Sequence, residues 1–238
     1  MMAERGLGRR PASDNSHLQK YPLTAATIPA KPMGVVVGWN WHRSMDDPVA
    51  DKDGNYWIRT LSGGIRGGHC VCLRPPSVPD LPSNWAFIDQ GVEGACVGAG
   101  WASERSLSER RRFDLFAIYE HAKRVDEWQG EAYDGTSVRA GGRVCHEHGG
   151  PYLARKKEPR QVEALGISAY RWAASVEDIA RVLAKDEAEA QAILTRGWID
   201  VLNSWGTDYP NPMARSRNTR FPLELVERLT FGEDGDAC

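Results

Sequence analysis

The chain has 238 residues, 41% of them apolar, which is enough to bury an ordinary core in one globular unit or two small lobes. Lysine and arginine number 30 against 32 aspartates and glutamates, so a net charge near −2 leaves no basic surplus for holding a nucleic-acid backbone. No run of 18 apolar residues can cross a bilayer, and the charged start of the chain lacks the apolar stretch of a secretory signal. We therefore expect a soluble cytoplasmic protein without nucleic-acid or membrane partners.

Five cysteines, thinly spread over the chain, make an odd number and do not suggest a disulfide framework, so at least one thiol should be free. Residues 1–32 are polar and contain four prolines, a composition that favours a tail or an extended strap. The valines at 35–37, followed by Trp39 and Trp41, predict a buried strand. A second strand is expected at Tyr56–Ile58, with a polar loop before it.

A third strand is predicted after the glycines at 63, 64, 67 and 68. Because side chains alternate between the two faces of a strand, His69, Val71 and Leu73 should share one face and Cys70 and Cys72 the other. Four prolines between 75 and 82 end this β-rich block.

The middle of the chain has the pattern of helices. We expect helices over Ala95–Arg110 and Phe113–Trp128, the second with one face formed by Phe116, Tyr119, Ala122 and Val125. A third should be capped by Thr136 or Ser137 and stop at Gly149, and a fourth should run from Ser175 through Leu183, with Asp178 completing its capping box. Ile199–Leu202 predicts a short strand, and nothing after Gly232 is expected to pack.

The densest chemical signal is the loop Asp89–Cys96, whose glycines deliver a cysteine to the start of a helix. The unpaired N–H groups and dipole of a helix N-terminus stabilise a thiolate, so we expect a lowered pKa and high reactivity for Cys96. Gln90 lies six positions earlier, where a turn can return its amide to a developing oxyanion. The alternative interpretation is a buried, inert cysteine.

The stretch from Gln90 to Cys96 resembles the glutamine and cysteine loop of papain-like cysteine peptidases. Asn203-Ser204-Trp205-Gly206-Thr207 is similar to the asparagine motif of that family. Gly135–Arg139 looks like a helix-opening segment of bacterial and phage members, and Gly68–Val71 looks like the strand that carries the family's histidine. These stretches cover nearly the whole chain from about Val35 onward.

Two features depart from the family pattern. Val97 stands where the family has an aromatic residue after the nucleophile. In papain-like enzymes the histidine lies between the cysteine and the asparagine, whereas His69 precedes Cys96 and no histidine occurs between Ala184 and Leu202. We infer that a segment of the β-rich lobe has moved to the N-terminal side of the nucleophile, since a triad is defined by geometry and not by chain order.

The resemblance implies an α+β, papain-like fold of two lobes, segmentally permuted. The β-rich lobe would comprise residues 33–80 and 161–231, the helical lobe residues 81–160, and the C-terminal tail residues 232–238. It also implies a cysteine peptidase that hydrolyses peptide bonds of a polypeptide substrate through a thioester acyl-enzyme, and that requires neither a cofactor nor a metal. Its implied catalytic residues are Cys96 as nucleophile, His69 as base, Asn203 to hold the imidazole and Gln90 in the oxyanion hole, while Gly94 and Trp205 would contact substrate.

Two other functions remain open: a papain-fold amidase or acyltransferase, and a catalytically silent papain-like module used for binding or assembly. A zinc site is a third interpretation, because Cys145-His146-Glu147-His148 with Cys70 and Cys72 supplies soft ligands. The paired spacing of zinc knuckles is missing, however. The resemblance to bacterial and phage members suggests a bacterial host cytoplasm as the location if the protein is phage-encoded.

Overall fold

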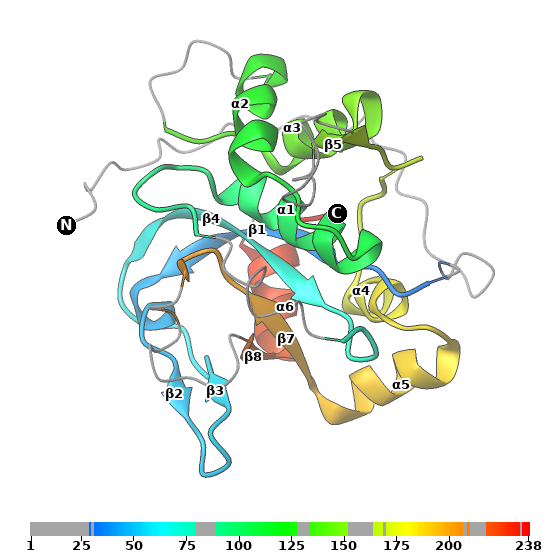
Figure 1. Ribbon diagram of the computed structural model, residues 1–238. Coiled ribbons are helices and arrows are strands. Elements are labelled where there is room, and N and C mark those ends of the chain that lie inside the picture. Colours follow the sequence, from blue (N-terminus) through cyan, green and yellow to red (C-terminus); the bar gives the residue numbers. More distant parts are fainter. Residues whose placement is uncertain are drawn as a thin grey trace.

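The computed structural model describes Pro29 and residues 31–79, 89–127, 134–151, 164–168, 170–206, 209, 218–233 and 235–238. Within these residues the protein is a mixed α+β fold with six α-helices and a seven-stranded mixed sheet (Figure 1). The expected lobe boundaries near 81 and 160, and Thr207 of the asparagine motif, fall outside the described residues, as do residues 1–28.

The main sheet has the strand order β2-β3-β8-β7-β4-β1-β9. Its strands are β1 (Val35–His42), β2 (Val49–Ala50), β3 (Tyr56–Trp57), β4 (Ile65–Arg74), β7 (Trp198–Leu202), β8 (Asn218–Pro222) and β9 (Asp236–Ala237). All neighbouring pairs are antiparallel except β3 and β8. Strand β4 pairs with β1 on one side and with β7 on the other, so segments from the beginning and the end of the chain meet in the middle of the sheet. A second sheet consists of β5 (Gly150–Pro151) and β6 (Ala164–Leu165).

The predicted strands over 35–41 and 69–73 are confirmed as β1 and β4. The predicted alternation along β4 is also confirmed, because Val71 and Leu73 join a core on one face of the sheet and Cys70 joins a second core on the other. The strand expected at Tyr56–Ile58 is present as the shorter β3.

The α-helices are α1 (Cys96–Glu109), α2 (Leu115–Val125), α3 (Val138–Arg143), α4 (Val176–Leu183), α5 (Glu187–Arg196) and α6 (Leu223–Glu227). One turn of 3₁₀-helix (Arg43–Met45) and two π-helical turns (Val144–His148 and Arg228–Gly232) extend or connect them. The predicted caps Ser137 and Ser175 accept N–H groups of α3 and α4. The Asp178 carboxylate instead accepts from the Ala174 N–H, so the expected capping box is incomplete.

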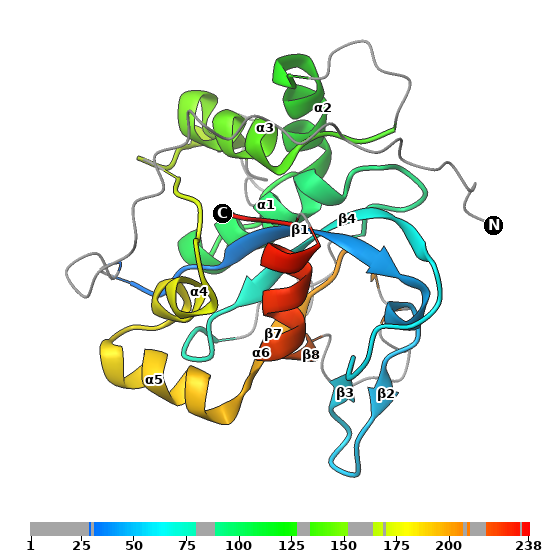
Figure 2. The same ribbon diagram turned by 180° about the vertical axis from the view of Figure 1, so that it is seen from behind.

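Two hydrophobic cores flank the pair formed by β1 and β4. Helices α1, α2 and α3 pack over one face of these strands, and α4 and α6 lie toward the other face (Figures 1 and 2). Helices α1 and α2 cross at Gly98, where an added Cβ would lie 2.3 Å from the Leu115 carbonyl oxygen. Helix α1 is therefore held between the sheet and α2, which fixes the position of its first residue, Cys96.

The elements that were not predicted are α5, β8, α6 and the two-residue strands β2, β5, β6 and β9. The expectation that nothing packs after Gly232 was wrong, because β9 pairs with β1 and the Ala237 side chain is buried. Phe116 was expected on the buried face of α2, yet it is 40% exposed, while Tyr119 and Ala122 are buried as expected.

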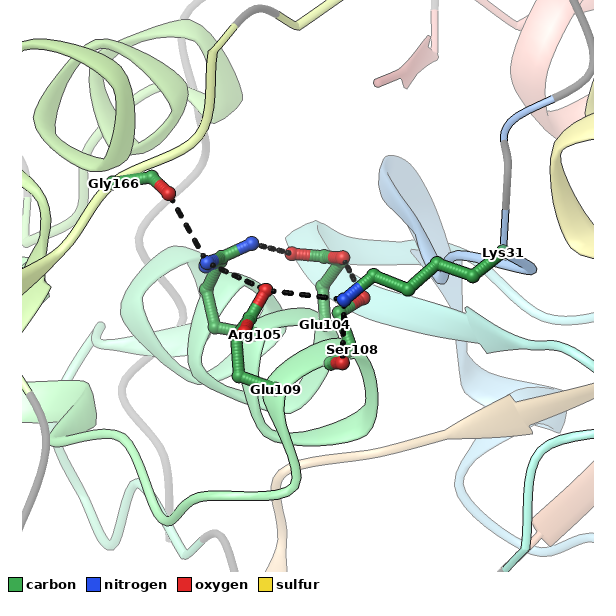
Figure 3. A network of polar contacts seen from close by, with 6 residues as sticks. All are labelled: Lys31, Glu104, Arg105, Ser108, Glu109 and Gly166. Atoms are coloured by element: carbon green, nitrogen blue, oxygen red, sulfur yellow. Dashed lines mark hydrogen bonds and ion pairs between the residues drawn. The ribbon is translucent and has the colours of Figure 1, made fainter.

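An ionic network holds the far end of α1 (Figure 3). The Lys31 ammonium donates to the Ser108 carbonyl oxygen at 2.9 Å and to the Glu109 carboxylate at 3.3 Å, and that carboxylate also receives a guanidinium N–H of Arg105. Glu104 and Arg105 are 2% and 3% exposed and form an ion pair at 3.9 Å. Ser108 is twelve positions after Cys96 on α1, which corresponds to a rise of about 18 Å along the helix. Lys31 is thus fixed far from Cys96, so the idea of a strap across the cleft receives no support from this residue.

Candidate active site

The loop that precedes Cys96 is fastened to the segment that follows β7. The Gln90 backbone N–H donates to the Ser204 carbonyl oxygen at 2.9 Å, the Ser204 hydroxyl donates to the Gln90 side-chain oxygen, and Asp89 forms an isolated β-bridge with Trp205. Loop and segment lie more than 110 residues apart in the chain. These contacts bring the two predicted motifs together around the first turn of α1.

His69 and Asn203 are in direct contact, as predicted. Pairing of β4 with β7 aligns Cys72 with Leu202 and so brings the residues after β7 alongside His69. The His69 Nε2 lies 2.7 Å from the Asn203 side-chain oxygen, which also accepts the Ser204 N–H. Since an amide oxygen only accepts hydrogen bonds, Nε2 must carry the ring proton of neutral His69. This contact leaves Nδ1 as the nitrogen that can take up a proton.

Aromatic rings enclose the imidazole. The Trp41 ring meets His69 edge-on with centroids 4.7 Å apart, and the Trp205 ring lies 4.9 Å away and tilted. The two indoles also contact each other at 5.2 Å. His69 is consequently only 7% exposed. Trp205 and Trp41 thus both shield the His69 imidazole from solvent.

Burial shifts the pKa values of His69 and Cys96 in opposite directions. It lowers the pKa of His69 to about 4, although the bond to Asn203 and the charge of Asp46 act in the opposite direction. Burial also raises the pKa of Cys96, with the backbone N–H groups of Cys70, Val97 and Cys96 acting against it. The expectation of a lowered Cys96 pKa was therefore wrong: the helix N-terminus does favour the thiolate, but desolvation outweighs it. At pH 7 the Cys96 thiol and the His69 imidazole are therefore both neutral.

Gln90 is buried, and its side-chain nitrogen donates one N–H to the Glu93 carbonyl oxygen at 2.8 Å. A primary amide has two N–H groups, so one remains for an oxyanion. The Gly94 backbone N–H donates to the Asp134 carboxylate at 3.2 Å, and the expected contact of Gly94 with substrate stays a prediction. An added Cβ on Gly94 would lie 2.0 Å from the Asp134 carbonyl oxygen, so only glycine fits this approach.

Asp134 was missed by sequence reasoning. Its carboxylate accepts from Gly94 and, at 2.9 Å, from the Tyr119 hydroxyl, so it ties the segment before α3 to the loop before Cys96 and to α2. Its negative charge also acts to raise the pKa of Cys96. The one available signal was its place directly before Gly135-Thr136-Ser137.

The structure brings Cys96, His69, Asn203, Gln90 and Trp205 into one region. Among the described residues no hydrogen bond joins His69 to Cys96, so the expected contact between the base and the thiol stays a prediction. The other described histidines lie elsewhere: His42 pairs with Glu233, the rings of His121 and His148 stack together, and His146 contacts the Ser168 carbonyl oxygen.

No group of three or more histidine, cysteine, aspartate or glutamate residues in the described part of the chain is arranged to hold a metal ion. No helix in this described part of the chain has the length and apolar character needed to span a membrane. Comparisons of the chain with protein-family models, with curated proteins and with solved structures found no match.

Proposed function

We propose that the protein is a cysteine peptidase that hydrolyses peptide bonds through Cys96, His69 and Asn203. One observation carries the proposal: the 2.7 Å hydrogen bond between His69 and Asn203, enclosed by two indoles next to a helix that begins at a cysteine. A buried imidazole with an oriented Nε2–H and an available Nδ1 is what a general base requires.

The mechanism follows from the neutral protonation states. Cys96 transfers its S–H proton to Nδ1 of His69 while the sulfur attacks the substrate carbonyl carbon, and the displaced C=O electron pair moves to oxygen. The oxyanion receives the second N–H of Gln90 and the backbone N–H of Cys96. Collapse breaks the C–N bond, His69 returns the proton to the leaving amine, and a thioester on Cys96 remains. Water then attacks the thioester, His69 again takes the proton, and the acid is released with the thiol restored.

The arrangement of the strands supports the permuted, papain-like interpretation of the sequence. Strand β4, which precedes Cys96 in the chain, pairs with β7, which follows it, and this pairing aligns the histidine with the asparagine. Helix α1, with the nucleophile, lies on the other side of β4 and packs against α2 and α3. A β segment that has moved along the chain can therefore occupy the same place beside the asparagine strand, since strand pairing depends on adjacency in space and not on order in sequence.

The proposal is tested with a library of internally quenched peptides at pH 7–8. We expect turnover by the full chain that disappears in Cys96→Ser and His69→Gln and persists in His146→Gln, the matched histidine control. Retention of turnover in Cys96→Ser would overturn the proposal. Adding an amine or an amino acid ester as acceptor distinguishes an acyltransferase, which would form the new amide in preference to the acid. Absence of turnover with both kinds of acceptor would leave the silent binding module as the better interpretation.

A further inference from the structure

Cys70 follows His69 on β4 and points away from it, toward α1. It is 2% exposed, and its backbone N–H is directed at the Cys96 thiol. The nucleophile thus has a second cysteine as its neighbour on the strand that supplies the base. The proposed peptidase mechanism has no use for this second thiol.

Gly100 locates the sulfur of Cys70. An added Cβ on Gly100 would lie 2.8 Å from the Cys70 sulfur, so the absence of a side chain at this position makes room for that sulfur against α1. Positions 96 and 100 are four residues apart and occupy the same face of the helix, with Cβ positions about 5–6 Å apart. The Cys70 sulfur therefore sits one helical turn below the nucleophile, on the same face of α1.

We propose that Cys70 is the resolving cysteine for oxidation of Cys96, and that a Cys70–Cys96 disulfide forms reversibly under peroxide and switches the site off. The inference rests on the proposed role of Cys96 as a reactive thiol. A nucleophile with an adjacent second thiol avoids the irreversible oxidation to sulfinic acid that an isolated thiolate undergoes.

The chemistry balances with hydrogen peroxide as oxidant. The Cys96 sulfur attacks one peroxide oxygen as its S–H proton passes to the leaving oxygen, the O–O bond breaks, and Cys96 sulfenic acid and water result, so sulfur is oxidised and peroxide is reduced. The Cys70 thiol then attacks the Cys96 sulfur as its proton leaves with the sulfenic hydroxyl, which gives the disulfide and water. A dithiol reductant breaks the disulfide by exchange and returns both thiols.

The other cysteines have different surroundings. The Cys72 sulfur lies one further turn along α1, beside Glu104 and near the carbonyl oxygen of Leu73. Cys145 is buried at the junction of α3 and its π-helical turn, and Cys238 pairs through its backbone with Val36. Cys72 is thus the matched control for Cys70: it lies on the same strand and the same face, and is also buried.

The test is peptide mapping by mass spectrometry after the full chain is treated with hydrogen peroxide, without any substrate. We expect a Cys70–Cys96 cross-linked peptide in the wild type and in Cys72→Ser, reversed by dithiothreitol. In Cys70→Ser, with Cys70→Ala as a second variant, Cys96 should instead accumulate as sulfinic acid. The rate of recovery of iodoacetamide labelling at Cys96 after reduction gives an independent readout of reversal.

A disulfide between any other pair of cysteines would overturn the inference, and so would equal sulfinic acid at Cys96 in the wild type and Cys70→Ser. Absence of any Cys96 oxidation would also overturn it. Because no step requires turnover, the disulfide can form in a protein that fails to cleave peptides, and peptide cleavage can occur in a protein that fails to form the disulfide.

Discussion

Acid should destabilise the fold through His69. The pKa of this imidazole is 6.5 in an ordinary environment and about 4 in the folded protein, because burial disfavours the charged ring. Between these two values the unfolded chain binds a proton that the folded chain does not. Titration of His69 therefore leaves the free energy of unfolding unchanged above pH 6.5 and lowers it as the pH falls below 6.5. The whole contribution of His69 is lost below pH 4.

The magnitude follows from the two pKa values. At about 1.4 kcal/mol for each pKa unit, the gap between them corresponds to about 3 kcal/mol of unfolding free energy, of which about 2 kcal/mol is lost by pH 5. This loss is a large fraction of the stability of an ordinary domain. The measurement is urea unfolding followed by tryptophan fluorescence at pH 7 and at pH 5.

The comparison of variants isolates the contribution of His69 from the other groups that titrate. His69→Gln should lose about 2 kcal/mol less than the wild type between pH 7 and pH 5, whatever its stability at pH 7. His146→Gln, which changes a more exposed ring, should behave as the wild type does. If the wild type and His69→Gln lose the same free energy over this interval, His69 is not a buried neutral group and the protonation states used in the mechanism are wrong.

Three further outcomes are expected. The rate of Cys96 alkylation by iodoacetamide should keep rising with pH up to and beyond pH 9, because burial raises the thiol pKa; a rate that is constant between pH 6 and pH 8 would indicate a preformed thiolate instead. Gln90→Ala should reduce turnover about 100-fold while changing the alkylation rate little, and a loss below about threefold would remove Gln90 from the oxyanion hole. Arg105→Ala should lower the free energy of unfolding, measured in urea, by about 3–5 kcal/mol, because the Glu104 carboxylate then stays buried without the guanidinium. Lys31→Ala, at the exposed end of the same network, should lower it by less than about 1 kcal/mol. Equal losses in the two variants would contradict this account of the network.

The local features of the fold were predictable from the sequence. The apolar run of β1, the alternation along β4 and the caps at Ser137 and Ser175 each depend on a few neighbouring residues, and each is present. The contact of His69 with Asn203 was also predictable, but only by assuming that the strands carrying them are neighbours.

The missed elements depend on contacts that a local pattern does not contain. Helix α5 buries only Ala190 and Ile193 behind a polar sequence, so its hydrophobic pattern is weak. Strand β9 has two residues and exists because it pairs with β1, some 200 residues earlier. The expected lowering of the Cys96 pKa failed for a similar reason: the helix N-terminus is visible in the sequence, whereas the burial that opposes it comes from packing against β4.

The most direct test of the central claim, that Cys96 is a nucleophile activated by His69, is covalent labelling with a peptidyl vinyl sulfone, followed by intact-mass measurement and peptide mapping. We predict a single adduct on Cys96 in the wild type. Labelling should be lost in His69→Gln, strongly slowed in Asn203→Ala and unchanged in His146→Gln. An adduct on another cysteine, or equal labelling rates in the wild type and His69→Gln, would contradict the claim.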